Sequence, residues 1–255
     1  MTTLRYGLTL YTLRDFIKTP KDIASTLHRV KAIGYNHVQL SALGPIDPKE
    51  LKTMLDSEGL DVVITHVGYD RLMDDLPAVI AEHHLWGCKH VALGALEDDM
   101  RNREGFIRFA REGSEIGRKL ADAGLTFSYH NHAFEFEKLE GRRPIDILFE
   151  DSDLTVFLAE VDTYWVQYGG ADPAAWIRRL AGRQVVTHFR DYQIDKNKPV
   201  DCEVGEGNLN WPAILDACRA AGVEWGIVEQ SSFRRDPFES VAISWRNLKA
   251  MGLQP

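Results

Sequence analysis

Eight short apolar runs alternate with amphipathic segments along the chain, and this alternation restricts the fold more than any other feature. The apolar runs cover residues 6–10, 38–40, 62–66, 90–93, 126–130, 156–161, 185–189 and 226–229. Runs of this kind are expected for strands that are buried on both faces. The amphipathic segments, which we predict to be helices, cover residues 21–33, 48–57, 76–86, 103–123, 144–150, 173–180, 211–221 and 237–251.

The boundaries of these segments support a closed barrel. Asp47–Pro48, Asp172–Pro173 and Asp236–Pro237 each place a capping carboxylate before a proline at the first helical position. Strand–helix units that repeat without a break imply a parallel sheet, and eight units favour a closed barrel over an open sheet. The 255 residues are close to the ~250 typical of a (β/α)8 barrel. We therefore predict an α/β protein with a single TIM-barrel domain over residues 1–255.

Charge and composition limit the kinds of partner. The formal net charge of −8 argues against a general nucleic-acid binder, which needs a positive surface. No apolar run approaches the ~20 residues that span a membrane, and the N-terminus lacks the features of a secretory signal. Cys88, Cys202 and Cys218 lack metal-ligand spacing and fit reduced thiols. We expect a cytoplasmic protein that acts on a small molecule and that could form a homo-oligomer.

Side chains that can bind a metal stand at the C-terminal ends of the last four strands. They are His130, Asp162, His188 and Glu229. A (β/α)8 barrel has its active site at this end of the strands, and two imidazoles with two carboxylates suit Mn, Co, Zn or Fe. One such residue alone is more often a satisfied polar group or a helix cap. Four at the same end of successive strands favour a shared site.

The two-residue repeat of a strand places further polar side chains on the same faces. Glu160 shares a face with Asp162, and Arg190 shares one with His188. A charge inside a barrel is costly unless it is paired or bound to metal. Glu160 is therefore expected either to hydrogen-bond a ligand histidine or to bind the metal itself. His66 ends the third strand and also faces the mouth of the barrel.

Residues beyond these strand ends complete the predicted pocket. Trp165 belongs to an aromatic stretch that could form a sugar-stacking wall or pack in the helix layer. Glu206 lies in the stretch VGEGNLNW, on the side where barrels carry their active-site loops, although Asn210 there could simply cap a helix. Tyr11 and Gln39 are equally well explained as ordinary barrel filling. We assign to substrate binding, or to support of the metal ligands, Glu160, Arg190, Trp165, Tyr11, Gln39 and Glu206.

The motifs resemble a known family. The stretches YHNHAFEFE, AEVDTYWVQYGGADPAAWIRRLAGR, HFRD, VGEGNLNW and WGIVEQ look like those of the xylose-isomerase-like sugar phosphate isomerase/epimerase barrels. The resemblance covers nearly the full chain and specifies no substrate. It implies one divalent metal held by Glu, Asp, His and Glu from strands five to eight. Asp162, His188 and Glu229 match the last three, while His130 stands where the first glutamate would be.

This departure bears on the reaction that the resemblance implies. Epimerases of the family use two carboxylates, one on each side of the substrate carbon, while the metal polarises the carbonyl and stabilises an enediolate. A metal-bound His130 has no lone pair with which to accept a proton. A one-base reaction then remains, either isomerisation or the loss or addition of water or an alcohol at the β carbon. Alternatively, Glu160 binds the metal and His130 is the second base.

We therefore predict a metal-dependent sugar isomerase/epimerase of carbohydrate metabolism that acts on a keto-sugar, with manganese favoured over Co, Mg, Zn and Fe. Glu229 is the expected base, and His132 or His66 the expected acid. One alternative is a lyase, either a hydratase or a β-eliminating enzyme that cleaves 3-keto-glycosides. Others are an AP-endonuclease-like nuclease, against which the charge argues, and a non-catalytic sugar-binding barrel. No nucleic-acid or membrane partner is expected.

Overall fold

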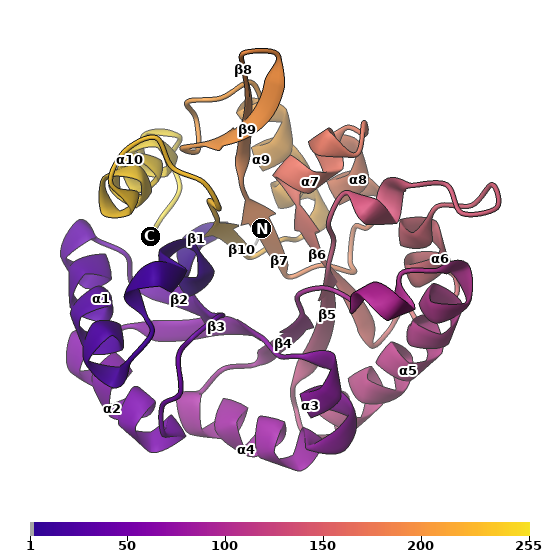
Figure 1. Ribbon diagram of the computed structural model, residues 1–255, viewed down its shortest axis with the longest axis horizontal. Helices are drawn as coiled ribbons and strands as arrows, with labels where there is room; N and C mark the ends of the chain where they lie inside the picture. Colours follow the sequence, from indigo (N-terminus) through magenta and orange to yellow (C-terminus); the bar gives the residue numbers. More distant parts are fainter. Residues whose placement is uncertain (1–2) are drawn as a thin grey trace.

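A computed structural model describes residues 3–255 of the chain. Eight parallel strands close into a barrel in the order β1-β10-β7-β6-β5-β4-β3-β2 (Figure 1), so the predicted (β/α)8 barrel is confirmed. Each observed strand begins and ends within one residue of its prediction. The strands are β1 (Arg5–Thr9), β2 (His37–Leu40), β3 (Asp61–His66), β4 (His90–Leu93), β5 (Thr126–His130), β6 (Phe157–Asp162), β7 (Val186–Phe189) and β10 (Trp225–Val228).

Helices surround the barrel as an outer ring (Figure 1). Those that the sequence predicted are α1 (Pro20–Ile33), α2 (Pro48–Glu58), α4 (Leu76–Trp86), α5 (Arg103–Asp122), α6 (Pro144–Glu150), α8 (Pro173–Arg179), α9 (Trp211–Ala221) and α10 (Pro237–Ala250). Asp47, Asp172 and Asp236 each accept backbone N–H groups at the start of their helix, as their positions predicted. None of the helices in residues 3–255 has both the length and the apolar composition that crossing a bilayer requires.

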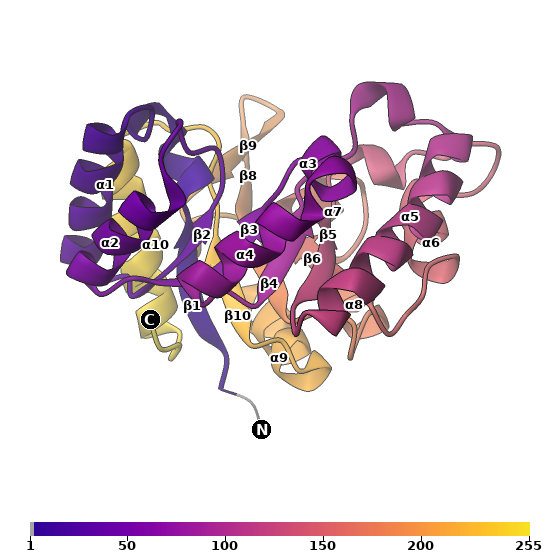
Figure 2. The ribbon, with the colours of Figure 1, turned by 90° about the horizontal axis from the view of Figure 1, so that it is seen from below.

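Several short elements on the C-terminal side of the barrel were not predicted. They are helices α3 (Tyr69–Asp74) and α7 (Thr163–Tyr168), the 3-10 turns 10–16, 98–100 and 134–136, and a hairpin of β8 (Asp191–Asp195) and β9 (Lys198–Cys202). In Figure 2 the hairpin rises at the top, opposite the N-terminus. Its turn uses Lys196 and Asn197 at φ values of 47° and 64°. The turn lacks the glycine that usually marks such a hairpin in a sequence.

Packing on both sides of the strands fixes the position of the site. Behind β5 and β6, the rings of Phe109, Phe127 and Phe157 form edge-to-face contacts with centroids 5.6–6.4 Å apart. A smaller buried cluster includes Ile64, Val186 and Ile227, which precede His66, His188 and Glu229 by two residues. Because side chains two residues apart share a face of a strand, this cluster fills the barrel directly beneath the polar residues of the mouth.

Candidate metal centre

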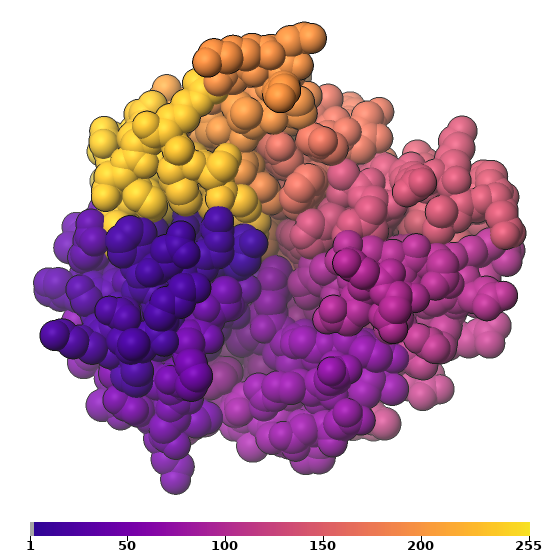
Figure 3. Space-filling view, viewed as in Figure 1, coloured from indigo at the N-terminus to yellow at the C-terminus, as the bar shows by residue number. Residues whose placement is uncertain are grey.

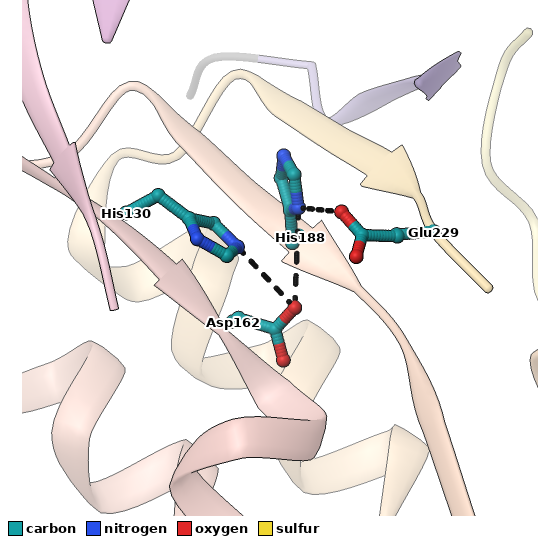
Figure 4. Close-up of side chains that lie close together, drawn as sticks. All are labelled: His130, Asp162, His188 and Glu229. Atoms are coloured by element: carbon teal, nitrogen blue, oxygen red, sulfur yellow. Dashed lines mark ion pairs between the residues drawn. The ribbon is translucent and has the colours of Figure 1, made fainter. Parts of the chain in front are cut away.

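Four buried side chains converge at the C-terminal end of the barrel (Figure 4). His130 ends β5, Asp162 ends β6, His188 lies in β7 and Glu229 follows β10. Each offers one ligand atom, and these four atoms lie within 4.8 Å of one another. All four residues are buried, and none is more than 5% exposed. The structure therefore brings together the four residues that the sequence predicted as ligands.

The hydrogen bond at one nitrogen of His130 fixes the role of the other. Its Nδ1 lies 3.1 Å from the carbonyl oxygen of Gly94, and a carbonyl can only accept, so Nδ1 carries the hydrogen. The lone pair is then on Nε2, which lies 3.4 Å from Asp162 Oδ2. A neutral imidazole held in this way by its second nitrogen is the usual arrangement of a metal-ligating histidine.

His188 is held in the same way but through its opposite nitrogen. Its Nε2 lies 2.7 Å from Gln39 Oε1 and 2.9 Å from Glu160 Oε1, and both oxygens are acceptors. The Nδ1 lone pair therefore faces the ligand cluster, 2.9 Å from Glu229 Oε2 and 3.9 Å from Asp162 Oδ2. The two histidines thus direct their free lone pairs toward the same carboxylates.

Three atoms of this cluster are buried without a hydrogen-bond partner: His130 Nε2, Asp162 Oδ2 and His188 Nδ1. The short separation of His188 Nδ1 from Glu229 Oε2 is an ion-pair distance whose angles are not those of a hydrogen bond. Buried polar atoms without partners cost about 1–3 kcal/mol each. Because these atoms face one another, a cation between them would satisfy all three, and the residues present fit a metal ion.

Asp162 has two roles, one for each carboxylate oxygen. Oδ1 accepts a hydrogen bond of 2.8 Å from the backbone N–H of Trp165 and so caps α7. Oδ2 makes no hydrogen bond and faces the histidines. One residue can therefore both cap a helix and offer a ligand atom, so these two explanations of a strand-end carboxylate are compatible.

The charge of the surroundings also fits a cation. Glu160, Asp162, Glu229 and Asp201 are buried carboxylates, and the one guanidinium among them is that of Arg190. Arg190 binds Asp201 through Nε at 2.7 Å and Nη2 at 3.0 Å, and Glu229 through Nη1 at 3.1 Å. Buried charges are stable only when they are paired or coordinate metals, so this excess of carboxylates favours a bound divalent ion.

The protonation states follow the same electrostatics. Burial, reinforced by His188, lowers the pKa of His130 to about 3, so this imidazole is neutral as a ligand must be. Burial raises the pKa of Asp162 to about 7. Burial would lower the pKa of His188, but the carboxylates of Glu160 and Glu229 raise it to about 10. When no metal is bound, this raised pKa favours a proton on Nδ1, and a cation at Nδ1 would displace that proton and take over its positive charge.

Glu160 supports the cluster from the side of the barrel interior. It accepts from His188 and from His66 Nε2 at 2.8 Å, and Gln39 Nε2 lies 3.2 Å from it. His66, Glu160 and His188 are also near enough to hold an ion. Their facing atoms already bond to one another, however, so the ion fits better among the unpartnered atoms. Of the two roles considered for Glu160, its contacts support the bond to a ligand histidine.

A cavity of about 380 Å³ opens above the cluster, and Figure 3 shows a recess near the centre of this face. The predicted residues that line the cavity are Tyr11, His66, His130, His132, Trp165, Arg190 and Glu229. Of the aromatic stretch, Trp165 reaches the cavity, whereas Tyr164 is buried beneath Arg190 and Tyr168 is exposed. Gln39 is fully buried and does not line the cavity; it bonds Glu160 and His188 instead.

The structure does not bring Glu206 to the cavity. Glu206 is exposed and lies 3.3 Å from Asn247. The reason is the buried carboxylate of Asp191, which accepts hydrogen bonds from Gly205 N–H, Gly207 N–H and the indole of Trp211 at 2.8, 3.1 and 2.6 Å. These bonds draw the backbone of the loop inward, so that the side chain of Glu206 points away.

Several residues of the site were not predicted from the sequence. Ser41, Glu97 and Ser231 line the cavity, and Asp201 anchors Arg190 from β9. Glu97 and Ser231 follow the C-terminal ends of β4 and β10, a position that could have drawn attention to them. Asp201 gave no such signal, because it lies in a hairpin that the sequence pattern did not predict.

Comparisons with known proteins agree with this architecture. No protein-family model matches the chain. Over 66% of this chain, the sequence is 26% identical to an inosose dehydratase of Geobacillus kaustophilus. That match spans 62% of the dehydratase, less than two thirds of its length.

Solved structures are similar over nearly the whole chain. A sugar phosphate isomerase/epimerase from Parabacteroides distasonis has a TM-score of 0.82 and 20% identity, with 98% of this chain and 95% of that one covered. An L-ribulose 3-epimerase has a TM-score of 0.74 and 19% identity, with 98% of this chain and 95% of that one covered. The chain therefore has the xylose-isomerase-like (β/α)8 barrel fold that its motifs led us to expect.

Proposed function

We propose that this chain is a divalent-metal-dependent enzyme of the sugar phosphate isomerase/epimerase family, which moves a proton next to the carbonyl of a keto-sugar or related polyol ketone. The observation that carries the proposal is the convergence of three buried, unpartnered ligand atoms next to a cavity that His130 and Glu229 line. His130, Asp162, His188 and Glu229 would hold the ion. Their two imidazoles and two carboxylates suit Mn, Co, Zn or Fe, of which we favour manganese.

A cation at this position would draw electron density from a substrate carbonyl oxygen and so make the adjacent C–H more acidic. The residues of the chain then supply the proton transfer. Glu229 lines the cavity and is the base that we propose for the adjacent C–H. Burial raises its pKa, but His188 and Arg190 outweigh this effect and hold it below the usual range. Glu229 is therefore ionised but weakly basic, so it needs an acidified C–H.

His66 is the residue that we propose to exchange a proton with a substrate oxygen. Its Nε2 donates to Glu160 at 2.8 Å, so its Nδ1 carries a lone pair, with Ser41 Oγ 3.5 Å away. In this state His66 accepts a proton from a hydroxyl and can return it to the neighbouring oxygen, as an isomerisation requires. His132 also lines the cavity, and burial lowers its pKa to about 3, which makes it a neutral partner for substrate hydroxyls.

A lyase is the second candidate, and two observations favour it. A curated relative that matches part of the chain is a dehydratase. In addition, a second cavity of about 330 Å³ shares Ser41, His66 and Val67 with the first, which would give room to a leaving group. In that reaction Glu229 removes the proton, and a protonated His66 or the N–H of neutral His132 donates to the oxygen that leaves the β carbon.

We propose a small carbohydrate as the partner and the cytoplasm as the location. The cysteines of the described chain, Cys88, Cys202 and Cys218, are free and buried, as is usual in a reducing compartment. We also propose that residues 1–255 act as one domain.

The test is incubation of the metal-loaded protein with ketoses, inososes and 3-keto-glycosides in deuterated water. Mass spectrometry and NMR then give the product and the position of deuterium. An isomerase or epimerase gives an unchanged carbon skeleton with deuterium next to the former carbonyl, whereas a lyase gives loss of water or of an alcohol. Protein that is fully metal-loaded but exchanges no deuterium into any of these compounds would contradict the proposal.

A further inference from the structure

The carboxylate of Asp201 lies in a set of hydrogen-bond donors of the kind that binds an anion. Its Oδ2 lies 3.2 Å from the backbone nitrogen of Ser231, 3.2 Å from that of Ser232 and 3.3 Å from Ser232 Oγ. Arg190 adds a two-point contact to both carboxylate oxygens. Successive backbone N–H groups beside a guanidinium form an anion-binding concavity. We name these donors of Arg190, Ser231 and Ser232 the anion cradle.

The anion cradle lies where many (β/α)8 barrels bind phosphate. That site is formed by the loops that follow the seventh and eighth strands of the barrel. Here Arg190 follows β7, the seventh barrel strand, and Ser231 and Ser232 follow β10, the eighth. Arg190 and Ser231 line the cavity above the metal ligands. Asp201 reaches the cradle from β9 and is 7% exposed.

We infer that Asp201 is a built-in anion that fills this cradle and excludes a phosphate or carboxylate group of the substrate from it. That the enzyme thereby selects an uncharged keto-sugar rests on the proposed function. That Asp201 occupies the cradle does not. Asp201 thus acts as a specificity-determining residue. It closes an anion site with a side chain of the protein itself.

The remaining lining of the cavity offers little to an anionic substrate. Among the described residues that line it, Arg190 is the one lysine or arginine, and each of its three nitrogens already contacts a carboxylate oxygen. Glu97 and Glu229 line the same cavity. A phosphorylated sugar would meet these two carboxylates without a free lysine or arginine among the described lining residues to offset them.

Removal of the Asp201 carboxylate should open the cradle to inorganic phosphate. The experiment measures thermal unfolding of Asp201→Ala, Asp195→Ala and wild-type protein against phosphate, with sodium chloride to match ionic strength. Asp195 is the matched control, because its half-exposed carboxylate lies on the same hairpin and pairs with Arg234. Phosphate should stabilise Asp201→Ala at concentrations about tenfold or more below those that affect the other two proteins. An identical response of all three folded proteins would overturn the inference.

Substrate selection gives a second test that does not depend on the folding of Asp201→Ala. Wild-type protein should turn over a free keto-sugar with a kcat/KM at least about tenfold above that for its phosphate ester. Asp201→Ser, a smaller change, should narrow this ratio. A wild-type preference for the ester would overturn the inference. If no sugar reacts but phosphate still stabilises Asp201→Ala selectively, the proposed function fails and the anion cradle stands.

Discussion

Glu160 Oε1 lies 2.9 Å from His188 Nε2, on the side of the imidazole opposite the nitrogen that faces Asp162 and Glu229. This contact fixes which nitrogen of His188 carries a hydrogen, so that the other can serve as a ligand. The second oxygen of Glu160 bonds His66. One buried carboxylate therefore orients both a proposed metal ligand and a proposed proton carrier.

Glu160→Gln should weaken metal binding about 10–100-fold, as is usual when the group that orients a ligand histidine is changed. The amide can still accept from His188, but its NH₂ group then faces the N–H of His66. Competition with a chelating dye measures the affinity. Glu203→Gln is the matched control, because Glu203 is buried and bonds Ser240 away from the site. Equal metal affinity of both variants would contradict the orienting role.

Asp162→Ala should abolish stoichiometric metal and activity, because it removes an unpartnered ligand oxygen from the centre of the cluster. It also removes the cap of α7, which costs about 1 kcal/mol. Asp172→Ala removes only a cap, that of α8, and so separates the two effects. Metal analysis should find the ion in Asp172→Ala and not in Asp162→Ala. Full metal content in Asp162→Ala would exclude it as a ligand.

Glu229→Gln should keep weakened metal binding, because an amide oxygen can still coordinate. Solvent-deuterium exchange next to the substrate carbonyl should fall by about 10²–10⁴, as expected for loss of a general base. NMR of the substrate in deuterated water measures the rate. An unchanged rate would mean that another residue takes the proton.

His130→Glu should keep the metal and increase epimerisation relative to isomerase or lyase turnover. The new carboxylate can bind the metal and also accept a proton, whereas a metal-bound imidazole has no free lone pair. Product analysis and metal content are measured on the same preparation. The opposite result is informative. If wild-type protein is an efficient epimerase and the variant loses that activity but keeps its metal, His130 is a free base and not a ligand.

Asp191→Ala should lower the free energy of unfolding by about 3 kcal/mol, because it leaves the N–H groups of Gly205 and Gly207 and the buried indole N–H of Trp211 without their acceptor. Urea unfolding measures the change. Asp195→Ala, on the same hairpin but at a half-exposed position, should change stability by less than about 1 kcal/mol. Equal effects would mean that the loop does not depend on this carboxylate.

The sequence alone determined the barrel and the gathering of the four predicted ligands. Strands buried on both faces leave continuous apolar runs, and helix caps mark the intervening segments, so local patterns were enough to predict every barrel strand. Parallel strands in a closed barrel end on one face. His130, Asp162, His188 and Glu229 were therefore brought together by topology, without knowledge of any side-chain contact.

Only the tertiary structure decided how these side chains are used. The ring nitrogens of His130 and His188 are assigned by Gly94 and Glu160, which come from other strands of the barrel or the loops after them. Asp201 reaches Arg190 from an unpredicted hairpin. Such contacts depend on where loops from separate parts of the chain meet. Hydrophobic periodicity indicates which face of a helix or strand is buried, but not which residue a polar side chain on that face contacts.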